Sequence, residues 1–571
     1  MKNPLFYITT GFAIILAFSV QGQVNSWSVS LTSQGEGSES INKMETDDSG
    51  NIFISGSYSG SENVMIGDVL LEPQGSLFLD SFFGKLSPSG EPQWIHPLGD
   101  PGTVFLAVRD FTVDDEGFSY VLIFVVPFVA DLPLSFEFAG LTLNHLPGAG
   151  DTSILVKINQ DGNGIWSKTL TGDASSVANA NLTLLSDGNI LVSGNFIGEA
   201  QFDEISLFSD GGAGLDLFAA KLDVNDDFVW ANRFGSVELD QFVVAEPADD
   251  GGYFMSGYWS GEEFSIGGLT VTNDNPVIGG NFDRWIAKLD LDGVGEWLVR
   301  EASLGDEAEA VLKTTSDGGV MAVSYAYDPI EIGDQSFETG AIAASKYDDG
   351  GNLAFVKELI APEVGANSEL LFLEGDGDTF FLSTSFASNT IEIGGEVFEN
   401  QGGESGSYDG LLLEIDSEGD VTDGFSYGGD DQDYFTPAVL LPSGDLLISG
   451  AFSSSEITLG ETTLVNSGEF TSDFFIANLS LPLGLFESSF NRSNLLIYPN
   501  PAVDNIQISG QLQNGTPALV RIYTLEGRLI DEIVRTAKPN NLIDVSHLQT
   551  GAYLIEWVQG NDQFVGKFLK N

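Results

Sequence analysis

The stretch DDGGYFMSGYWSG at residues 249–261, followed by DRWIAKLDLDGVGEW at residues 283–297, decides the fold of this chain. A short apolar passage, FSIGGLTV, lies between them at residues 264–271. Dense apolar residues bounded by Gly, Asp and Ser predict strands, and the Gly-Gly inside FSIGGLTV predicts a hairpin tip. Variants of the whole passage occur seven times between Val24 and Ser480, so the chain contains an internal repeat.

Glycines mark two turns of the repeat. One follows the first strand with a period of about 66 residues, at Gly50, Gly117, Gly188, Gly251, Gly318, Gly377 and Gly444. The other lies near the hairpin tip, at Gly67, Gly140, Gly267, Gly333, Gly394 and Gly460, with Asp203-Glu204 in its place in the third copy. Tight turns between strands need positive φ, which glycine adopts at no steric cost. The second strand follows the first turn, as in NILVSGNFIG from Asn189, and is apolar enough for a strand covered on both faces.

The third strand is the most regular part of the repeat, as in DLFAAKL at residues 216–222. One position of this strand is a lysine in five copies: Lys85, Lys157, Lys221, Lys288 and Lys346. Such regularity permits a functional interpretation, but a ligand-binding group does not need repeating in every unit. We therefore favour a structural role, in which the lysine stem covers apolar surface and its ammonium group meets a neighbouring carboxylate.

An aromatic residue marks the fourth strand, at Trp27, Trp94, Trp166, Trp230, Trp297, Phe355 and Phe425. Trp27 precedes the first copy of the other three strands, whereas the last copy ends at Ser480 with no fourth strand after it. A strand around Trp27 would therefore complete the last unit and remove the exposed edges of a linear array. We predict an all-β chain with a seven-bladed β-propeller over residues 24–480, closed by its N-terminal strand.

The pattern D-x-F-x-x-K-L … G … W … G-G … D-G-N resembles the SBBP repeat of bacterial β-propellers across residues 24–480. Three copies depart from it, with Ala341, Glu414 and Asn478 at positions that are usually Asp or Lys. The resemblance implies a scaffold and no shared chemistry.

Residues 481–494 read as a linker, and residues 495–571 as a separate module. Alternating apolar positions such as Val520 and Ile522, between turns such as Glu526-Gly527, predict a small antiparallel β-sandwich. The module resembles the C-terminal sorting domain, type A, of the type IX secretion system of Bacteroidetes. The matching residues are Tyr498-Pro499-Asn500-Pro501, Gly527-Arg528, Asp544-Val545-Ser546, Gly551-Ala552-Tyr553 and Lys567-Phe568-Leu569-Lys570. This resemblance implies the type IX machinery as a partner.

Residues 1–23 have the features of a signal peptide, with Lys2 before a largely apolar run from Leu5 to Val20. A membrane anchor is the alternative, but a run of about 16 residues is shorter than the roughly 20 that span a bilayer, and no other stretch comes close. The chain has no cysteine, which excludes a lipid-modified Cys and any disulfide. We expect export to the periplasm, then a place on the outer cell surface or in the medium.

Charge is unevenly distributed. Residues 24–480 hold 13 Lys and Arg against 76 Asp and Glu, whereas residues 495–571 hold 6 against 7. The acidic repeats would repel phosphate backbones and anionic lipids, so nucleic acid is not an expected partner. Solubility explains this acidity more simply than a specific cation-binding role.

No constellation of residues predicts catalysis, and we expect no catalytic or cofactor-binding residue. Histidine is nearly absent, with His96 and His145 in unrelated parts of two repeats and His547 in the C-terminal module. Paired carboxylates for glycoside hydrolysis stay open, because the sequence does not locate a pair. Calcium is a further open question: DLDGVGE from Asp290 and NQDGNG from Asn159 match a calcium loop only in part, which favours ordinary turns. The acidic stretches DEAE at residues 306–309 and DDQD at residues 430–433 are other cation candidates, expected on one face around the channel.

We predict an exported propeller that acts as a binding or interaction module for an unidentified extracellular protein or glycan. Two alternatives remain: a carbohydrate-active enzyme with carboxylates at the channel mouth, and a structural surface protein stabilised by calcium.

Overall fold

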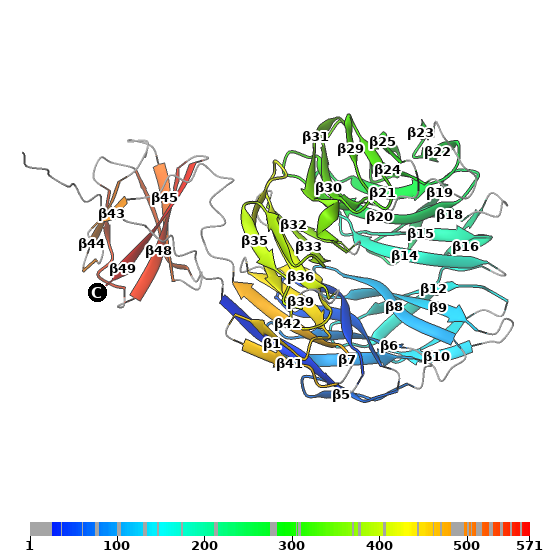
Figure 1. Ribbon diagram of the computed structural model, residues 1–571, viewed down its shortest axis with the longest axis horizontal. Coiled ribbons are helices and arrows are strands. Elements are labelled where there is room, and N and C mark those ends of the chain that lie inside the picture. The colour runs from blue at the N-terminus through cyan, green and yellow to red at the C-terminus, as the bar shows by residue number, and fades with distance from the viewer. Residues whose placement is uncertain are drawn as a thin grey trace, which may run out of the picture.

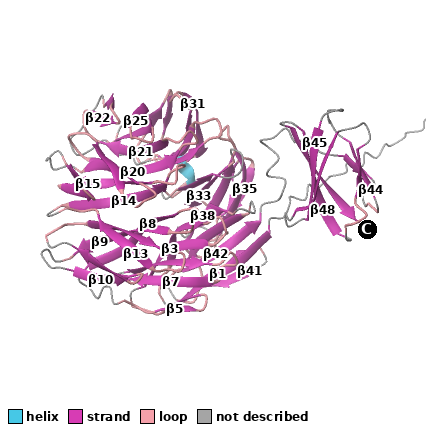
Figure 2. Cartoon of the chain, turned by 180° about the vertical axis from the view of Figure 1, so that it is seen from behind, coloured by secondary structure: helices cyan, strands magenta, loops and turns pink. Residues whose placement is uncertain are grey.

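The computed structural model describes residues 26–480 and 496–570. Its gaps lie at 36, 60, 75–78, 100–103, 129–133, 146–147, 173–174, 210–214, 274–281, 304, 306–309, 368–369, 375–378, 403–406, 442–444, 461, 469–470, 499–501, 504, 510–516, 525–528, 537–540, 549–550 and 560–561. The predicted signal segment, the whole predicted linker, Gly377 and Gly444 lie outside the described residues. The described chain is all-β apart from one 3-10 turn, η1 (Pro362–Val364), as Figure 2 shows.

Five sheets of the repeat region have four antiparallel strands each. The first sheet consists of β2 (Ser40–Thr46), β3 (Ile52–Ser59), β6 (Leu79–Leu86) and β7 (Pro92–Leu98), and the second of β8 (Val104–Val113), β9 (Ser119–Pro127), β12 (Thr152–Ile158) and β13 (Gly164–Thr169). The third consists of β14 (Ser176–Leu184), β15 (Ile190–Ile197), β18 (Asp216–Leu222) and β19 (Phe228–Phe234), and the fourth of β26 (Val311–Thr314), β27 (Val320–Tyr325), β30 (Ile342–Tyr347) and β31 (Leu353–Ile360). The fifth consists of β32 (Leu371–Glu374), β33 (Phe380–Phe386), β36 (Asp409–Ile415) and β37 (Val421–Tyr427). Each follows the predicted order of four strands.

Two further sheets have six strands, so the expected seven separate four-stranded sheets are not found; five are. One six-stranded sheet comprises β20 (Asp240–Pro247), β21 (Tyr253–Trp259), β24 (Asp283–Leu289), β25 (Gly295–Ser303), β28 (Ile330–Ile332) and β29 (Gln335–Phe337). The other comprises β38 (Asp433–Leu440), β39 (Leu446–Phe452), β42 (Asp473–Ser480), β1 (Ser26–Gly35), β4 (Val64–Ile66) and β5 (Val69–Leu71). The difference arises because the hairpins β28–β29 and β4–β5 pair with the outer strand of the preceding unit, β25 and β1.

The other hairpins form two-stranded sheets of their own. They are β10 (Leu134–Phe138) with β11 (Leu141–His145), β16 (Glu199–Phe202) with β17 (Ile205–Phe208), β22 (Glu263–Ile266) with β23 (Leu269–Thr272), β34 (Thr390–Ile393) with β35 (Glu396–Glu399), and β40 (Glu456–Leu459) with β41 (Thr462–Val465). Asp203, which replaces glycine at the third tip, has φ +51°, so the predicted left-handed turn is present there too.

The N-terminal strand pairs with the last strand of the repeat region. β1 runs antiparallel to β42, with Trp27 opposite Leu479 and Thr32 opposite Phe475, as the complementary chain ends predict. The first strands of the sheets contact one another in the order β2, β8, β14, β20, β26, β32, β38 and back to β2. The sheets therefore form a propeller-like ring, visible in Figure 1 with blue β1 beside orange β42.

Turn chemistry and burial explain why these residues form these strands. The glycines after the first strands adopt φ between +75° and +98° at the five described positions: Gly50, Gly117, Gly188, Gly251 and Gly318. Every residue of β12, β18, β24 and β36 is buried, as is every residue of β21 and β39, because the central strands of each sheet are covered on both faces.

The aromatic residue of the fourth strand joins one sheet to the next. The indole Nε1–H of Trp297 donates to the backbone carbonyl of Asp349 (3.0 Å), in the turn before β31. A Cβ on Gly351 in that turn would lie 2.7 Å from the Trp297 ring, so only glycine lets the turn approach so closely. Trp94 makes the equivalent contacts, with the carbonyl of Gln160 and with Gly162. The aromatic position thus sets the spacing between sheets.

The C-terminal module consists of two antiparallel sheets. Their strands are β43 (Leu496–Tyr498), β44 (Asn505–Ser509) and β47 (Asn541–Asp544) in one sheet, and β46 (Leu529–Thr536), β45 (Pro517–Thr524), β48 (Gly551–Gln559) and β49 (Asp562–Lys570) in the other. One apolar cluster is shared by both sheets, with Ile506 and Ile543 from the first and Val520, Ile522 and Ile555 from the second. In the described part of the chain, no helix is long and apolar enough to cross a membrane.

Candidate functional site

The lysines of the third strands serve the structural role that we favoured. Lys157 Nζ lies 2.6 Å from Asp226 Oδ1, and Lys221 Nζ lies 2.9 Å from Asp187 Oδ2. Lys85 and Lys346 pair with Asp47 and Asp317, and Lys288 with Asp250, Asp349 and Glu296. Each of these five ammonium groups therefore has a carboxylate partner within the ring.

The two partial calcium loops are turns. Asp290 Oδ1 accepts hydrogen bonds from the backbone N–H groups of Asp292 (3.0 Å) and Val294 (2.9 Å). Asn159 Oδ1 accepts equivalent bonds from Asp161 (3.0 Å) and Asn163 (2.9 Å). Side-chain oxygens that satisfy backbone donors in this way stabilise Asx turns. Both stretches thus have the local hydrogen bonds of Asx turns, and whether they also bind calcium stays an open question.

The acidic stretch at residues 430–433 also bonds to its own sheet. Asp430 Oδ1 accepts the Ser455 N–H (2.9 Å), and Asp433 Oδ2 accepts the Ser454 hydroxyl (2.7 Å) and the Gly429 N–H (2.8 Å). Residues 306–309 lie outside the described residues. Within the described ranges, no three acidic or histidine side chains come together as a metal-binding group.

The ring histidines lie in separate environments. The Nε2 of His96 on β7 lies 2.7 Å from the carbonyl of Gly162, and burial lowers the pKa of the imidazole. The Nδ1 of His145, at the end of β11, lies 2.9 Å from Thr152 Oγ1, and burial lowers its pKa as well. The structure does not bring the two histidines to one site. His547 follows β47 in the C-terminal module.

A cavity of about 690 Å³ lies where four successive sheets of the ring meet. Its lining includes the ends of the first strands β14, β20 and β26 and the residue that follows β8, so the cavity lies at one end of the ring of first strands. We call it the mouth pocket. Its lining residues are Asp114, Asp115, Glu116, Phe118, Tyr120, Lys157, Leu184, Leu185, Ser186, Gly188, Val224, Glu246, Pro247, Ala248, Asp249 and Thr314.

The cations near the mouth pocket are already paired. Lys157 bonds to Asp226 and lies over the rings of Phe118 (5.1 Å) and Tyr120 (4.9 Å). Glu246 pairs with Lys313 at 2.7 Å. The exposed charges of the pocket are therefore carboxylates, from Asp115, Glu116 and Asp249.

Two other features shape the chemistry of the mouth pocket. Burial raises the pKa of Asp114, although the N–H groups of Phe118 and Glu116 donate to its carboxylate. Val224 exposes 63% of its surface beside half-buried Leu184 and Phe118, so apolar surface adjoins the carboxylates. The pocket suits a ligand that presents both apolar faces and hydroxyl or cationic groups.

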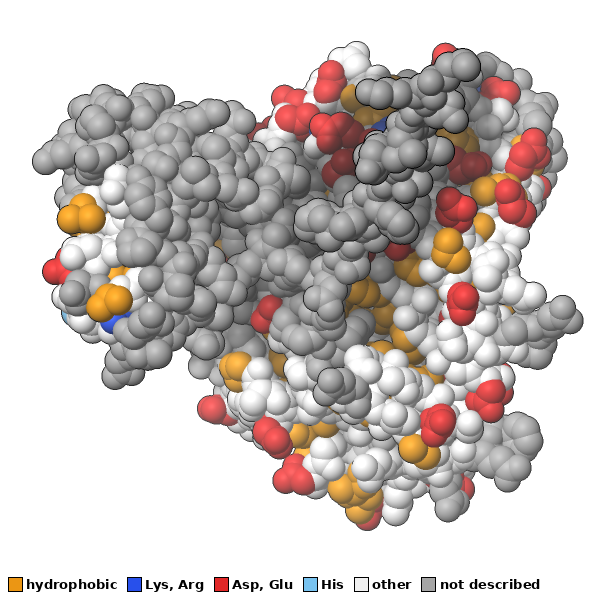
Figure 3. Space-filling model, turned by 60° about the vertical axis from the view of Figure 1, so that its left-hand side comes forward, with side chains coloured by type: hydrophobic (Ala, Val, Ile, Leu, Met, Phe, Trp, Pro, Cys, Tyr) orange, Lys and Arg blue, Asp and Glu red, His pale blue; other side chains and the backbone are white. Residues whose placement is uncertain are grey.

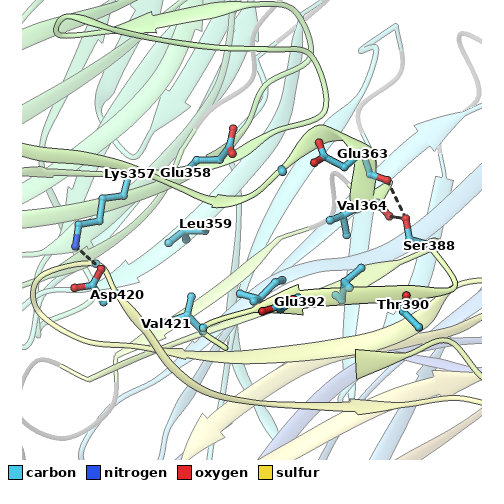
Figure 4. A pocket seen from close by; sticks show the side chains of 15 residues that line it. Lys357, Glu358, Leu359, Glu363, Val364, Ser388, Thr390, Glu392, Asp420 and Val421 are labelled. Atoms are coloured by element: carbon cyan, nitrogen blue, oxygen red, sulfur yellow. Dashed lines mark hydrogen bonds and ion pairs between the residues drawn. The ribbon is translucent and has the colours of Figure 1, made fainter. Parts of the chain in front are cut away.

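A second cavity, of about 750 Å³, lies between β31, η1, the β34–β35 hairpin and the start of β37. Figure 4 shows Glu358 and Glu363 on one side of this peripheral groove and Glu392 across from them. Lys357 bonds to Asp420 (2.6 Å), and the Ser388 hydroxyl donates to the carbonyls of Glu363 and Val364. The lining residues include no aromatic ring on which a sugar would stack. Among the charged side chains that Figure 3 colours, those of Asp and Glu predominate.

The sequence alone did not reveal either cavity or a set of buried acid pairs between sheets. Two of these pairs, Asp216 with Asp240 and Asp409 with Asp433, have the same separation of 24 residues, a regularity that sequence inspection could have found. The mouth pocket had no such signal, because its lining comes from four repeats.

Comparison with known proteins identifies the end of the chain. Residues 496–571 match the secretion system C-terminal sorting domain. The C-terminal module is therefore a type IX sorting domain, which implies export to the cell surface or the medium. No curated protein matches the chain.

Several solved structures resemble the chain at low similarity. One is a protein of unknown function from Dyadobacter fermentans, 12% identical with a TM-score of 0.34, covering 66% of this chain and 95% of that one. Another is the intramolecular trans-sialidase from Ruminococcus gnavus, 11% identical with a TM-score of 0.33, covering 78% and 94%. A third is the apocarotenoid oxygenase of Synechocystis, 10% identical with a TM-score of 0.31, covering 71% and 94%. We attach no activity to likenesses at this level.

Proposed function

We propose that the chain is an extracellular binding module: a propeller ring that the type IX machinery carries out of the cell and that holds its ligand in the mouth pocket. The match of residues 496–571 to a sorting domain is the observation that carries this proposal. The mouth pocket supports the binding role, because four sheets contribute to one cavity of a size that suits a small ligand or the tip of a larger one.

The same proposal includes the finer architecture. We take residues 1–23 as a signal peptide, 24–480 as the ring, 481–494 as a linker and 495–571 as the sorting domain with a sandwich fold. We assign seven blades to the ring, because each six-stranded sheet consists of four blade strands plus a hairpin from the next unit. The closed order of seven first strands supports that count.

The ligand class follows from the lining of the mouth pocket. Exposed carboxylates of Asp115, Glu116 and Asp249 accept hydrogen bonds from hydroxyl groups or attract cationic groups. Val224 and Phe118 offer apolar contact. A glycan or a basic segment of an extracellular protein has both features, whereas nucleic acid would be repelled.

Delivery is tested by truncation. Deleting residues 495–571 should leave a folded ring in the periplasm, and fusing that module behind a signal peptide and a reporter should carry the reporter to the surface. Cell fractionation in a host with the type IX machinery gives the answer. Surface delivery of the truncated chain would show that the module is only structural.

Binding is tested with a charge-reversal pair in the mouth pocket. Glu116→Lys with Asp249→Lys should reduce binding to a glycan or peptide array hit at least tenfold. Glu396→Lys with Glu399→Lys, on the exposed β35 strand, makes the same charge change away from the pocket and should bind normally. Equal losses in both variants would mean that overall charge, not the pocket, holds the ligand. Release of product from a bound polysaccharide would replace the binding role with an enzymatic one.

A further inference from the structure

Buried acidic side chains meet in pairs between adjacent sheets. One acid of each pair lies at the start of the third strand of a repeat, and the other lies at the start of the first strand of the following repeat. The pairs are Asp216 with Asp240, Asp409 with Asp433 and Asp473 with Glu39. Each of these six side chains is at most 3% exposed. Two carboxylates out of water repel each other strongly unless a cation or a proton lies between them.

The ring supplies such a cation in two sheets. Arg233 on β19 bonds to Asp216 (3.0 Å), and Arg300 on β25 bonds to Asp283 (2.6 Å). Both arginines occupy the same position in the strand pairing. Arg233 lies opposite Phe218, two residues after Asp216, and Arg300 lies opposite Trp285, two residues after Asp283. In the sheet closed by β1, that position is Thr32, opposite Phe475. Thr32 carries no charge, so the built-in cation is missing at this position in the closing sheet.

The pair in the closing sheet has the most unused oxygen atoms. Asp473 Oδ2 accepts the N–H (2.8 Å) and hydroxyl (2.7 Å) of Ser467. Asp473 Oδ1 and both carboxyl oxygens of Glu39 accept no well-formed hydrogen bond, although Glu39 is only 1% exposed. These three buried oxygens lie near one another and near the Ser33 hydroxyl, so either a proton shared by the two carboxyl groups or a bound cation would satisfy them.

The backbone is shaped around this carboxyl group. A Cβ on Gly35 would lie 3.0 Å from Glu39 Oε1, and one on Gly37 would lie 3.3 Å from it. The Glu39 N–H donates to the carbonyl of Ser472 (2.7 Å), which holds Glu39 beside Asp473. Burial, and then the charge of Asp473, raises the pKa of Glu39 to about 8, so ionising both carboxyl groups of the pair is unfavourable.

We propose that Glu39 and Asp473 bind a divalent cation of the calcium type, which locks the N-terminal segment to the last sheet and so closes the ring. Carboxylate oxygens are the ligands that such hard cations prefer. The Ser33 hydroxyl, itself 1% exposed and near Glu39, offers a neutral oxygen, and water completes the shell. The cation takes the role that the guanidinium group of Arg233 has beside Asp216 and that of Arg300 has beside Asp283. The sheet of Asp409 also lacks an arginine at this position, with Ser426 opposite Leu411, but its acid pair leaves fewer buried oxygens without a partner.

The test uses the full chain and Ca²⁺ as the probe. Calorimetric titration should detect one equivalent of Ca²⁺ in the wild type that is lost in Glu39→Gln. In thermal unfolding, CaCl₂ should raise the Tm above NaCl at matched ionic strength, and this excess should also vanish in Glu39→Gln. Glu396→Gln, which removes an exposed acid from β35, is the control and should keep both responses.

Thr32→Arg sharpens the test, because it installs the cation that the sheets of Asp216 and Asp283 contain. The variant should unfold at the same Tm with and without Ca²⁺. An unchanged Ca²⁺ response in Glu39→Gln would overturn the assignment. A wild type that ignores Ca²⁺ but loses stability as the pH rises through 8 would also overturn it, in favour of a shared proton. None of these readouts depends on ligand binding or on delivery.

Discussion

The ring and the C-terminal module bury different kinds of side chain. The ring encloses charged groups, with Arg284 unexposed and Lys288 and Glu301 each 1% exposed, and it ties neighbouring sheets through them. The core shared by the two sheets of the C-terminal module is apolar, from Ile506 to Ile555. The buried ion pairs of the ring join neighbouring sheets through groups that must find one specific partner, whereas apolar contacts such as those of the C-terminal module need no specific partner.

Removing the closing strand is expected to separate the two regions most clearly. Deletion of residues 24–34 removes most of β1, including its ladder with β42 and buried Leu31. The free energy of unfolding of the ring should fall by more than about 5 kcal/mol. Because a loss of this size equals the whole stability of many domains, the ring should no longer unfold cooperatively. Calorimetry and size-exclusion chromatography measure both effects. The transition of the C-terminal module should stay at its original temperature; a shift there, or an unchanged ring, would refute closure by β1.

Breaking a buried ion pair should have the next largest effect. Arg284→Met leaves Glu301, which accepts the Arg284 Nε–H at 2.6 Å, buried with an uncompensated charge, and should cost about 3–5 kcal/mol. Lys357→Met removes a partner of Asp420 from an exposed pair and should cost less than about 1 kcal/mol. Denaturant unfolding compares the two. Similar costs would mean that burial of charge does not distinguish the ring.

The ring and the C-terminal module should respond oppositely to pH. Burial raises the pKa of Asp240 and Asp433 to about 7 and that of Asp409 to about 6, above the unfolded value of about 3.9. Folding therefore favours their protonated forms, and the stability that they contribute is complete at low pH and is lost as the pH rises through 6 and 7. In the C-terminal module, hydrogen bonds from Ser546 lower the pKa of Asp544. The stability that Asp544 contributes is therefore present at neutral pH and is lost only in acid.

Scanning calorimetry between pH 5 and 8 checks this sign. The Tm of the ring should fall across the range, and Asp240→Asn should reduce the slope. A ring whose Tm rises with pH would show that these carboxyls are ionised when folded.

A comparison of two glycine substitutions gives the smallest expected difference. Gly351 and Gly268 have φ of +77° and +85°, so Ala at either costs about 1–2 kcal/mol of backbone strain. Only at Gly351 would the new Cβ meet Trp297; at Gly268 it meets no atom within 4 Å. Gly351→Ala should therefore cost about 1–3 kcal/mol more, by chemical denaturation, because the indole must move. Equal costs for the two substitutions would show that Gly351 is not packed against the Trp297 ring of the neighbouring sheet.

Local chemistry made most of the ring predictable. Glycine at the turns, lysine on the third strands and an aromatic residue on the fourth strands each have a mechanism that acts within a repeat or between neighbours. The six-stranded sheets were not predicted, because pairing of β4 with β1 depends on how closely two repeats approach at the rim. The mouth pocket and the pair of Glu39 with Asp473 need ring closure before their residues meet.

The position of β42 has a mechanical consequence. The chain leaves the ring at Ser480, the end of a strand with hydrogen bonds to β39 on one side and β1 on the other. A pull on the C-terminal module therefore acts along β42 and loads both ladders in shear, so many bonds must break together before the strand slides. A tethered ring of this design would resist drag at the point where the tether enters.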